Sequence, residues 1–284
     1  MRISKHVRIA VLVLVVLLGS VAAKAWHDTM RDPVVQRVEL EWDALETSQT
    51  HRIVLLADLH VSGPDMPPDR LAAIVEQVNA IRPTIIMIAG DLVSDKRTAT
   101  RHYSVEEALA PLAHLYPAAV KVAVPGNHDH WRDIDAIEAE LVGHGITVLR
   151  NEVAEFAGIT VGGLDDDFTG QADLPAVLAG LELPDRPAIL LSHSPDPFAA
   201  VPPKTGIMLA GHTHCGQIGW PWGGSPATMS RYGQRYSCGV VEEQGNVLVT
   251  SAGLGTSVLP FRLFTQPEIW VIDLVPPTKK AAEP

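Results

Sequence analysis

Short runs of apolar residues recur along the chain from residue 51 onward, and several of them end at a polar block. Runs of this length, bounded by turn residues, predict strands that are buried on both faces of a sheet. They cover residues 52–57, 84–89, 120–124, 159–163, 188–192, 207–210, 247–251 and 269–274, and an earlier run predicts a strand at residues 35–42.

Segments with helical periodicity separate some of these runs. Residues 67–81 place apolar side chains on one face, and residues 104–115 and 133–142 are also predicted to be helices. Strands that alternate with helices indicate an α/β fold in which helices cover the sheets. The polar blocks directly after the strands lie where open α/β sheets bind their ligands.

The beginning of the chain has a different character. Arg2, Lys5 and Arg8 flank an apolar stretch at residues 9–23, which is 15 residues long and therefore short of the roughly 20 residues of a typical span. The sequence Ala23-Lys24-Ala25 fits a signal-peptidase site. Two interpretations remain: an uncleaved signal-anchor, which we favour, or a secretory signal that is cleaved near Ala25.

These patterns divide the chain into four parts. Residues 1–25 are the signal-anchor or signal peptide, and residues 26–50 are a linker with the first strand. Residues 51–275 form the predicted catalytic domain, and residues 276–284 are predicted to be a disordered tail.

Charge and cysteine content narrow the class of protein. The 284 residues carry a formal net charge of −11, and no cluster of Lys or Arg follows the first few residues. Because nucleic-acid binding needs clustered cations, no nucleic-acid surface is evident. Cys215 and Cys238 are the only cysteines, which excludes a disulfide framework but leaves one bridge open.

Five polar blocks carry the chemistry. Each alone has an ordinary explanation, since Asp and Asn suit turns and a single His is more often structural than a ligand. Together they combine carboxylates, one amide and several imidazoles, a set that suits Mg, Mn, Zn or Fe. Glycines at positions 90, 126 and 211 are expected to let the backbone turn sharply. The blocks are Asp58-Leu59-His60, Gly90-Asp91 with Asp95, Gly126-Asn127-His128-Asp129, His193, and Gly211-His212-Thr213-His214.

In this order the blocks resemble the calcineurin-like metallophosphoesterase superfamily, whose pattern is D-x-H, G-D-x-x-x-D, G-N-H-D, H and G-H-x-H. The resemblance covers about residues 51–275 and implies a sandwich of two β-sheets flanked by helices. It also implies two divalent metal ions, with Mn favoured and Fe, Zn or Mg as alternatives. One ion would be held by Asp58, His60 and His214, the other by Asn127, His193 and His212, with Asp91 bridging both.

The resemblance further assigns the catalytic residues. His128 would be the catalytic histidine, Asp129 would orient it, and Asp95 would be a supporting acid. Two cations about 3.5–4 Å apart can hold a hydroxide between them and clamp the phosphoryl oxygens. A protonated His128 could then supply the proton that the leaving group needs. This predicts a phosphoric ester hydrolase that cleaves a phosphodiester or pyrophosphate bond.

Features after the last block resemble the membrane-associated or exported bacterial branch of the superfamily. These are Gly211–Gln217 (GHTHCGQ), Trp220-Pro221-Trp222, Gly253–Ser257 and Leu259–Arg262. Position 215 is usually Gly in that branch, and we expect Cys215 to fill a small pocket. A structural role for Arg262 is favoured over a phosphate clamp, and Trp220 and Trp222 could rim a ligand pocket, meet a membrane interface or simply pack.

The branch includes manganese-dependent phosphodiesterases and some UDP-2,3-diacylglucosamine pyrophosphatases of lipid A synthesis. A phosphorylated small molecule or a lipid-linked compound is therefore the expected substrate. The positive-inside tendency predicts a bacterial inner-membrane protein with an extracytoplasmic, periplasmic catalytic domain, anchored by the N-terminal segment. This orientation conflicts with the lipid A intermediate, which lies on the cytoplasmic side, and the conflict stays open here.

Two other classes are disfavoured. A non-catalytic scaffold of this fold would have lost ligands, whereas all seven predicted ligands and His128 are present. A metallo-β-lactamase-like enzyme needs H-x-H-x-D-H, but Cys215, Gly216 and Gln217 follow His214.

Overall fold

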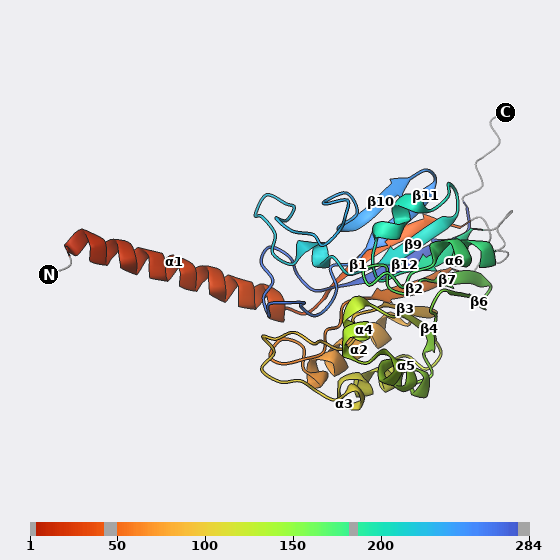
Figure 1. The fold of residues 1–284 in the computed structure, drawn as a ribbon, viewed down its shortest axis with the longest axis horizontal. Coiled ribbons are helices and arrows are strands. Elements are labelled where there is room, and N and C mark those ends of the chain that lie inside the picture. The colour runs from red at the N-terminus through yellow and green to blue at the C-terminus, as the bar shows by residue number, and fades with distance from the viewer. Residues whose placement is uncertain (1–3, 43–49, 182–186, 278–284) are drawn as a thin grey trace.

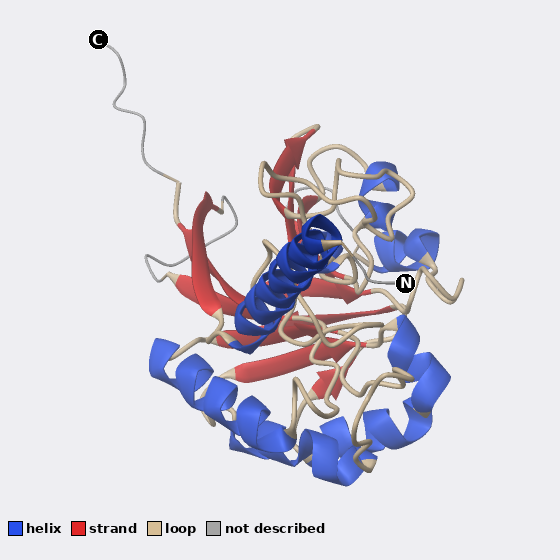
Figure 2. Cartoon of the chain, turned by 90° about the vertical axis from the view of Figure 1, so that its left-hand side faces the viewer, coloured by secondary structure: helices blue, strands red, loops and turns tan. Residues whose placement is uncertain are grey.

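The computed structural model describes residues 4–42, 50–181 and 187–277. Two six-stranded sheets stack on one another and helices cover their outer faces (Figures 1 and 2). This confirms the predicted α/β fold with two sheets flanked by helices. The predicted tail falls outside the described residues from position 278 onward.

The first sheet has the order β1-β12-β2-β3-β4-β5, and its central strands β2, β3 and β4 are parallel. Strand β12 runs antiparallel to β2 and parallel to β1. The bounds are β1 (Val34–Glu41), β2 (His51–Leu56), β3 (Ile85–Ala89), β4 (Val120–Val124), β5 (Thr147–Val148) and β12 (Glu268–Val275).

The second sheet has the order β10-β11-β9-β8-β7-β6, with parallel neighbours from β11 to β7 and antiparallel strands at both edges. The bounds are β6 (Glu152–Phe156), β7 (Ile159–Gly163), β8 (Ala188–Leu191), β9 (Gly206–Ala210), β10 (Gly239–Glu243) and β11 (Asn246–Thr250). The edge strands β6 and β10, together with β5, were not predicted.

Alternating side chains of β2 show how the layers are built. Ile53 and Leu55 pack between the two sheets, while Val54 and Leu56 pack against the helices on the outer face. Both sets are fully buried, so the strand needs apolar residues at every position. This explains why the apolar runs of the sequence were continuous rather than alternating.

The outer face of the first sheet is covered by α2 (Pro68–Ile81), α3 (Val105–Leu109) and α5 (Ile134–Gly143), and α6 (Leu174–Gly180) covers the second sheet. The predicted helix at residues 104–115 is divided into α3 and the 3₁₀ helix η1 (Ala110–His114). Pro111 lies in the first turn of η1, and it cannot donate the backbone hydrogen bond that would continue α3. Three short helices complete the list: α4 (Asn127–Arg132), η2 (Asp196–Ala200) and η3 (His214–Gly216).

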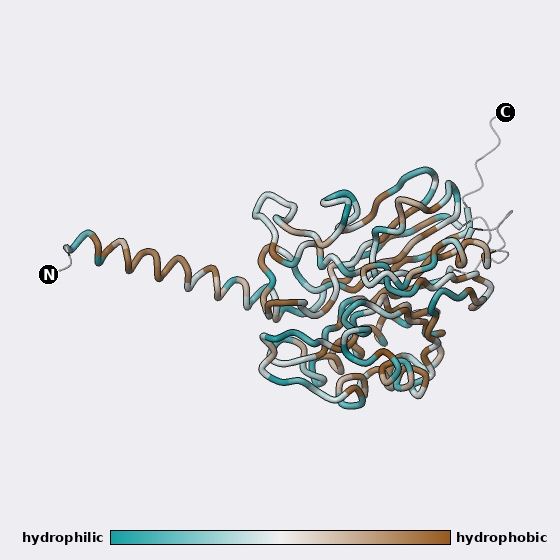
Figure 3. The backbone as a smooth tube through the Cα atoms, in the orientation of Figure 1, coloured by the Kyte–Doolittle hydropathy of each residue, from teal (hydrophilic) through white to brown (hydrophobic). Residues whose placement is uncertain are grey.

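Helix α1 (Lys5–Met30) projects away from the rest of the molecule (Figure 1). Its side chains are exposed up to Lys24, and hydrophobic residues follow one another along most of it (Figure 3). Within the described residues it is long and apolar enough to cross a membrane, a property that a signal sequence shares. The predicted linker starts later than expected, because residues 26–30 continue the helix.

Candidate metal centre

The predicted ligands lie at one edge of the sandwich, where strands of both sheets end. In the first sheet the polar blocks follow β2, β3 and β4, and in the second sheet they follow β8 and β9. Because these strands are parallel neighbours within each sheet, their carboxyl ends bring the blocks together. The residues are Asp58 and His60 after β2, Asp91 after β3, Asn127 after β4, His193 after β8, and His212 and His214 after β9.

The backbone of this edge is unusual. Five of the predicted ligands have left-handed backbone conformations, with φ angles between 44° and 70°. Such conformations cost about 1–3 kcal/mol each for residues other than glycine, and they concentrate at functional sites. Backbone hydrogen bonds hold two of them, from the N–H of Asp58 to Gly90 at 3.1 Å and from the N–H of His60 to Asp91 at 2.9 Å. The five residues are Asp58, His60, Asp91, His212 and His214.

Two of the three nearby glycines have a role that differs from the predicted one. Only Gly90 has a positive φ, of 73°, among the three glycines that were expected to provide sharp turns. A Cβ at Gly126 would collide with the carboxylate of Asp91, and a Cβ at Gly211 would lie 2.5 Å from Oδ2 of Asp58. These two positions therefore need glycine because the ligands approach the backbone closely.

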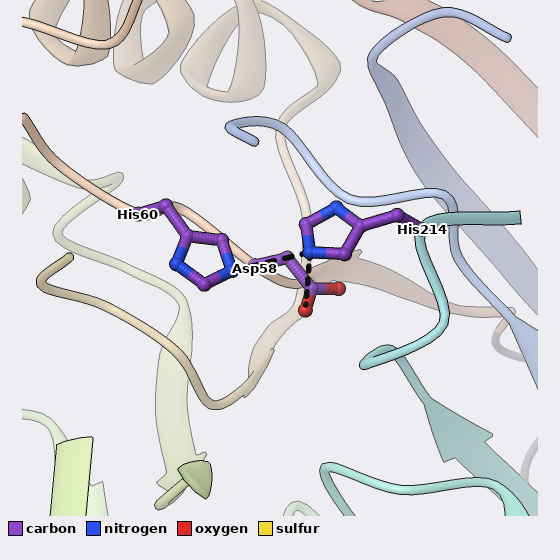
Figure 4. Close-up of side chains that lie close together, drawn as sticks. All are labelled: Asp58, His60 and His214. Atoms are coloured by element: carbon purple, nitrogen blue, oxygen red, sulfur yellow. Dashed lines mark hydrogen bonds and ion pairs between the residues drawn. The ribbon is translucent and has the colours of Figure 1, made fainter. Parts of the chain in front are cut away.

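Asp58, His60 and His214 form the first ligand group (Figure 4). Nε2 of His214 lies 3.5 Å from Oδ1 of Asp58 and 3.1 Å from Nε2 of His60. All three side chains are buried, and burial lowers the pKa of both imidazoles well below the usual range. The imidazoles are therefore neutral and offer lone pairs to a cation.

The second ligand group is formed by Asn127, His193 and His212. Nε2 of His193 lies 3.1 Å from Oδ1 of Asn127 and 3.1 Å from Nδ1 of His212. Nδ1 of His193 is 2.7 Å from the carbonyl oxygen of Ala89, which fixes the orientation of the ring. Nε2 of His212 and Nδ1 of His60 are buried without a hydrogen-bond partner in the described part of the chain.

Asp91 lies between the two groups. Its Oδ2 is 3.4 Å from Nε2 of His60 and 3.2 Å from Nε2 of His193, while its Oδ1 accepts from the N–H of His128 at 2.8 Å. One carboxylate oxygen is thus shared by both groups. The seven residues fit a pair of divalent cations, because their nitrogen and oxygen donors converge in a buried space.

The pKa values show the charge imbalance that the cations would relieve. Burial by itself would lower the pKa of His193, but the carboxylate of Asp91 outweighs it and raises this pKa to about 10. Burial raises the pKa of the Asp58 carboxyl to about 7. Binding of a cation at His193 would therefore require this imidazole to lose a proton.

His128 lies beside both groups, and its partner is Asp95. The Nδ1 atom of His128 is in short contact with Oδ1 of Asp95, and its Nε2 is 3.3 Å from Oγ of Ser257. The assignment of Asp129 as the residue that orients His128 does not agree with these contacts. Ser257 ends the Gly253–Ser257 segment that the sequence singled out, but its contact with His128 was not predicted.

Asp129 instead joins two loops. Its carboxylate accepts from the N–H groups of Asp91 at 2.8 Å, Leu92 at 2.8 Å and Gly126 at 2.9 Å. Because Asp129 is fully buried, it holds the loop after β3 against the loop after β4. It acts on the backbone that carries Asp91 rather than on the imidazole.

Arg262 has the structural role that was favoured for it. Its guanidinium is fully buried and donates from Nη2 to the carbonyl oxygens of Ala252 at 2.8 Å and Gly255. The same Nη2 lies 3.4 Å from Nδ1 of His214. The side chain therefore supports a predicted ligand from behind and does not line the pocket.

Cys215 does not fill a small pocket as expected, because it forms a disulfide with Cys238. The bridge ties the turn that carries His214 to a segment beside β10. A disulfide persists in oxidising compartments. Together with the apolar helix α1, it indicates an extracytoplasmic location.

A cavity of about 320 Å³ opens over the centre. Asp91, Asn127, His212 and His214 line its floor, with His128 at the side. Its outer walls are apolar and comprise Trp131, Phe168, Ile218, Met229, Val258 and Leu259. Among the described lining residues there is no Lys or Arg.

Known proteins resemble the chain in sequence. Residues 51–216 match the family described as calcineurin-like phosphoesterase. The chain is 32% identical over 232 residues to the uncharacterized metallophosphoesterase YkuE of Bacillus subtilis, with 78% of each chain covered. It is 30% identical over 237 residues to the phosphodiesterase YaeI of Escherichia coli, with 79% of this chain and 82% of that one covered.

Among solved structures, a 5′-nucleotidase precursor from Thermus thermophilus aligns with 80% of this chain at 15% identity and a TM-score of 0.42. The aligned region is 54% of that protein, so the chain spans about half of its length.

Proposed function

We propose that the chain hydrolyses phosphodiester bonds with the help of two divalent cations, because it belongs to the calcineurin-like phosphoesterase family. The observation that carries the proposal is the position of Asp91, whose Oδ2 lies within 3.4 Å of one ligand group and 3.2 Å of the other. A shared carboxylate between two buried groups is what a dinuclear centre requires.

The cations would be held by Asp58, His60 and His214 on one side and by Asn127, His193 and His212 on the other. When bound, they would activate a water and neutralise charge on the phosphoryl oxygens. Manganese is our first choice, because the donors mix hard oxygens with imidazoles. Fe, Zn and Mg can use the same donors.

The proposed role of His128 is to give a proton to the leaving oxygen. Its Nδ1 contacts Asp95, which orients the ring, and its Nε2 lies beside Ser257, with which it lines the cavity. Asp129 is proposed to keep Asp91 in place through the backbone. General acid catalysis of this kind contributes about 10²–10⁴-fold to a rate.

Two observations favour a diester over a monoester. A phosphomonoester carries about −2 charge at neutral pH, whereas a diester carries one negative charge. The described residues that line the cavity include no Lys or Arg to meet a second charge. The relative YaeI is named a phosphodiesterase, which agrees with this preference.

A pyrophosphatase acting on UDP-2,3-diacylglucosamine is the alternative within the same branch. The disulfide argues against it, because that compound lies on the reducing side of the membrane. We propose instead that α1 is a retained anchor and that the domain faces outward, as the positive-inside tendency also suggests.

The test uses the full chain in detergent. The protein is stripped of metal, reloaded with Mn²⁺ and assayed with bis-p-nitrophenyl phosphate and p-nitrophenyl phosphate. We expect metal-dependent turnover with faster cleavage of the diester, and Asp91→Asn should abolish it. Faster cleavage of the monoester would reverse the assigned substrate class, and turnover that survives chelation would rule out a metal-dependent reaction.

A further inference from the structure

Large apolar side chains gather on the surface around the end of α1. Outside α1, half of the exposed large hydrophobic side chains in the described part of the chain belong to two loops, with Trp222 at 79% exposure and Val258 at 69%. We call residues 218–222 and 258–264 the apolar collar. Its exposed members are Trp220, Trp222, Val258, Leu259, Phe261 and Phe264.

The two loops of the collar form one unit. The N–H of Gly219 donates to the carbonyl oxygen of Leu263 at 2.7 Å, and Ile218 pairs with Leu263 in a parallel bridge. The rings of Trp220 and Trp222 stack on each other with 5.5 Å between centroids. An apolar surface that is fixed in this way is typical of an interaction site.

The collar is attached to the last turn of α1. The N–H of Arg262 donates to Oγ1 of Thr29 at 2.6 Å, and the N–H of Phe264 donates to Oδ2 of Asp28 at 3.0 Å. The ring of Trp26 also packs against Phe261. The end of α1 and the loops around it, which Figure 2 shows in a view along the helix, are therefore joined by direct contacts.

One contact reaches the collar from the part of α1 before the predicted cleavage site, because Nζ of Lys24 lies 4.8 Å from the centroid of the Phe264 ring. Ala25 is buried, and its carbonyl oxygen accepts from Oγ1 of Thr29 at 2.7 Å inside the helix. A cleavage after Ala25 would cut through a helical turn that is docked on the domain. The retained anchor proposed above would keep the helix and the collar together.

The length of α1 determines how close the collar comes to the membrane. The apolar residues 9–23 extend about 22 Å as a helix, whereas the hydrocarbon core is about 30 Å thick. A short span draws its flanking residues into the membrane. The flanking surface here is the collar, and Trp and Phe are residues that the interface accepts.

Three residues of the collar also line the cavity, whereas Trp222 and Phe264 do not. Ile218, Val258 and Leu259 line the cavity above the predicted ligands, and Ser257 next to them contacts His128. A collar placed in the interface therefore brings the apolar wall of the cavity to the lipid. The neighbouring wall of Trp131, Phe168 and Met229 is apolar as well.

We propose that the collar lies in the membrane interface and that the cavity receives the phosphodiester group of a membrane lipid from there. This inference rests on the proposed phosphodiesterase function and names its substrate class. The lipid would keep its acyl chains along the collar while its single-charged phosphodiester reaches the metal centre.

The first experiment compares two chromogenic diesters that differ only in their alkyl chain. The full chain is reconstituted with Mn²⁺ in vesicles of phosphatidylethanolamine and phosphatidylglycerol, and hydrolysis of hexadecyl p-nitrophenyl phosphate and ethyl p-nitrophenyl phosphate is followed. We expect kcat/KM to be at least about tenfold higher for the hexadecyl diester. Trp222→Ser with Phe264→Ser should remove this preference and leave the ethyl diester unaffected.

Val142→Ser is the matched control, because Val142 is 59% exposed on α5 and does not belong to the collar. Equal rates for the two diesters in the wild type would overturn the inference and leave the proposed function intact. If neither diester is hydrolysed although metal is bound, the result would instead overturn the proposed function.

The second experiment measures the depth of the collar without any substrate. Tryptophan fluorescence is recorded in the same vesicles with brominated acyl chains, which quench residues that touch lipid. We expect Trp222→Phe to lose quenchable emission. Unchanged quenching in that variant would show that Trp222, the most exposed residue of the collar, does not touch lipid, and it would overturn the docking.

Discussion

The metal centre and the apolar collar distribute their side chains in opposite ways. The centre buries charged and polar residues such as Asp58 and His60, and the collar exposes large apolar residues such as Trp222. Either arrangement is costly for a protein in water by itself. Each would become favourable with the component proposed for it, cations in the first case and lipid in the second.

The difference also shows in what each region tolerates. In the centre, the positions of backbone and side chain depend on each other within tenths of an ångström, as the close approach of Gly126 to Asp91 shows. In the collar, exposed side chains have free space around them. Substitutions should therefore have large effects in the centre under all conditions, and effects in the collar that depend on a membrane.

The largest expected effect comes from His128→Ala. We expect kcat to fall by about 10³-fold, because the leaving oxygen loses its proton donor. Metal content measured by mass spectrometry should stay at the wild-type level. Loss of both metals in this variant would make His128 a ligand and contradict its assigned role.

The next largest effect comes from Gly126→Ala. The new Cβ would collide with the carboxylate of Asp91, and a displacement of about 1 Å near reacting groups can cost about 100-fold in rate. Steady-state kinetics with the diester measure it. Gly143→Ala on α5 is the control, because nothing lies within 4 Å of its Cβ position, and a similar loss there would refute the steric explanation.

A smaller effect is the response of metal affinity to pH. The pKa of His193 is raised to about 10, so this imidazole is protonated at neutral pH without metal and must lose its proton to become a ligand. Affinity should then rise by about tenfold per pH unit for this one proton, up to that pKa. Calorimetry of Mn²⁺ binding in buffers of different ionisation enthalpy measures the released proton. An affinity that is constant from pH 6 to 9 would contradict the assignment.

The smallest effect on activity is expected at the boundary of the two regions. The disulfide between Cys215 and Cys238 joins the ligand turn to a neighbouring segment, and the loop it closes has a sequence separation of 23. Replacing both cysteines by serine should lower the free energy of unfolding by about 3 kcal/mol. Urea unfolding measures this value, and kcat should change little. A loss of kcat similar to that of His128→Ala would show that the bridge belongs to the centre.

The sequence was sufficient to predict the candidate ligands, because these residues lie in short local motifs. All seven predicted ligands converge in the structure, since each follows a strand whose apolar run was recognisable. The α/β class followed from the same runs, whereas the two-sheet arrangement was implied by the resemblance to the family. The sequence could not separate the roles of Asp95 and Asp129. Asp129 directly follows His128 and Asp95 belongs to another motif, so only the contacts in the structure show which carboxylate faces His128.

Other features depend on contacts between distant segments and left no local signal. The left-handed backbone of His60 and His212 contradicts the preferences of histidine and is imposed by its surroundings. Asp28 and Thr29 follow an apolar stretch and looked like the start of a polar linker, yet both are buried against the loop at residues 262–264. Short exposed edge strands such as β6 and β10 bury too few side chains to produce a clear pattern.

Arg262 has a consequence for anyone who prepares a shortened, soluble form of this enzyme. Its backbone N–H is held by Thr29 of α1 at 2.6 Å, and its guanidinium reaches within 3.4 Å of the ring of His214. Deleting the hydrophobic N-terminus to gain solubility would loosen the last helical turn, and through a single arginine this loosening would reach the first ligand group. Low activity of a truncated preparation would then be an effect of the deletion and would not measure the activity of the intact chain.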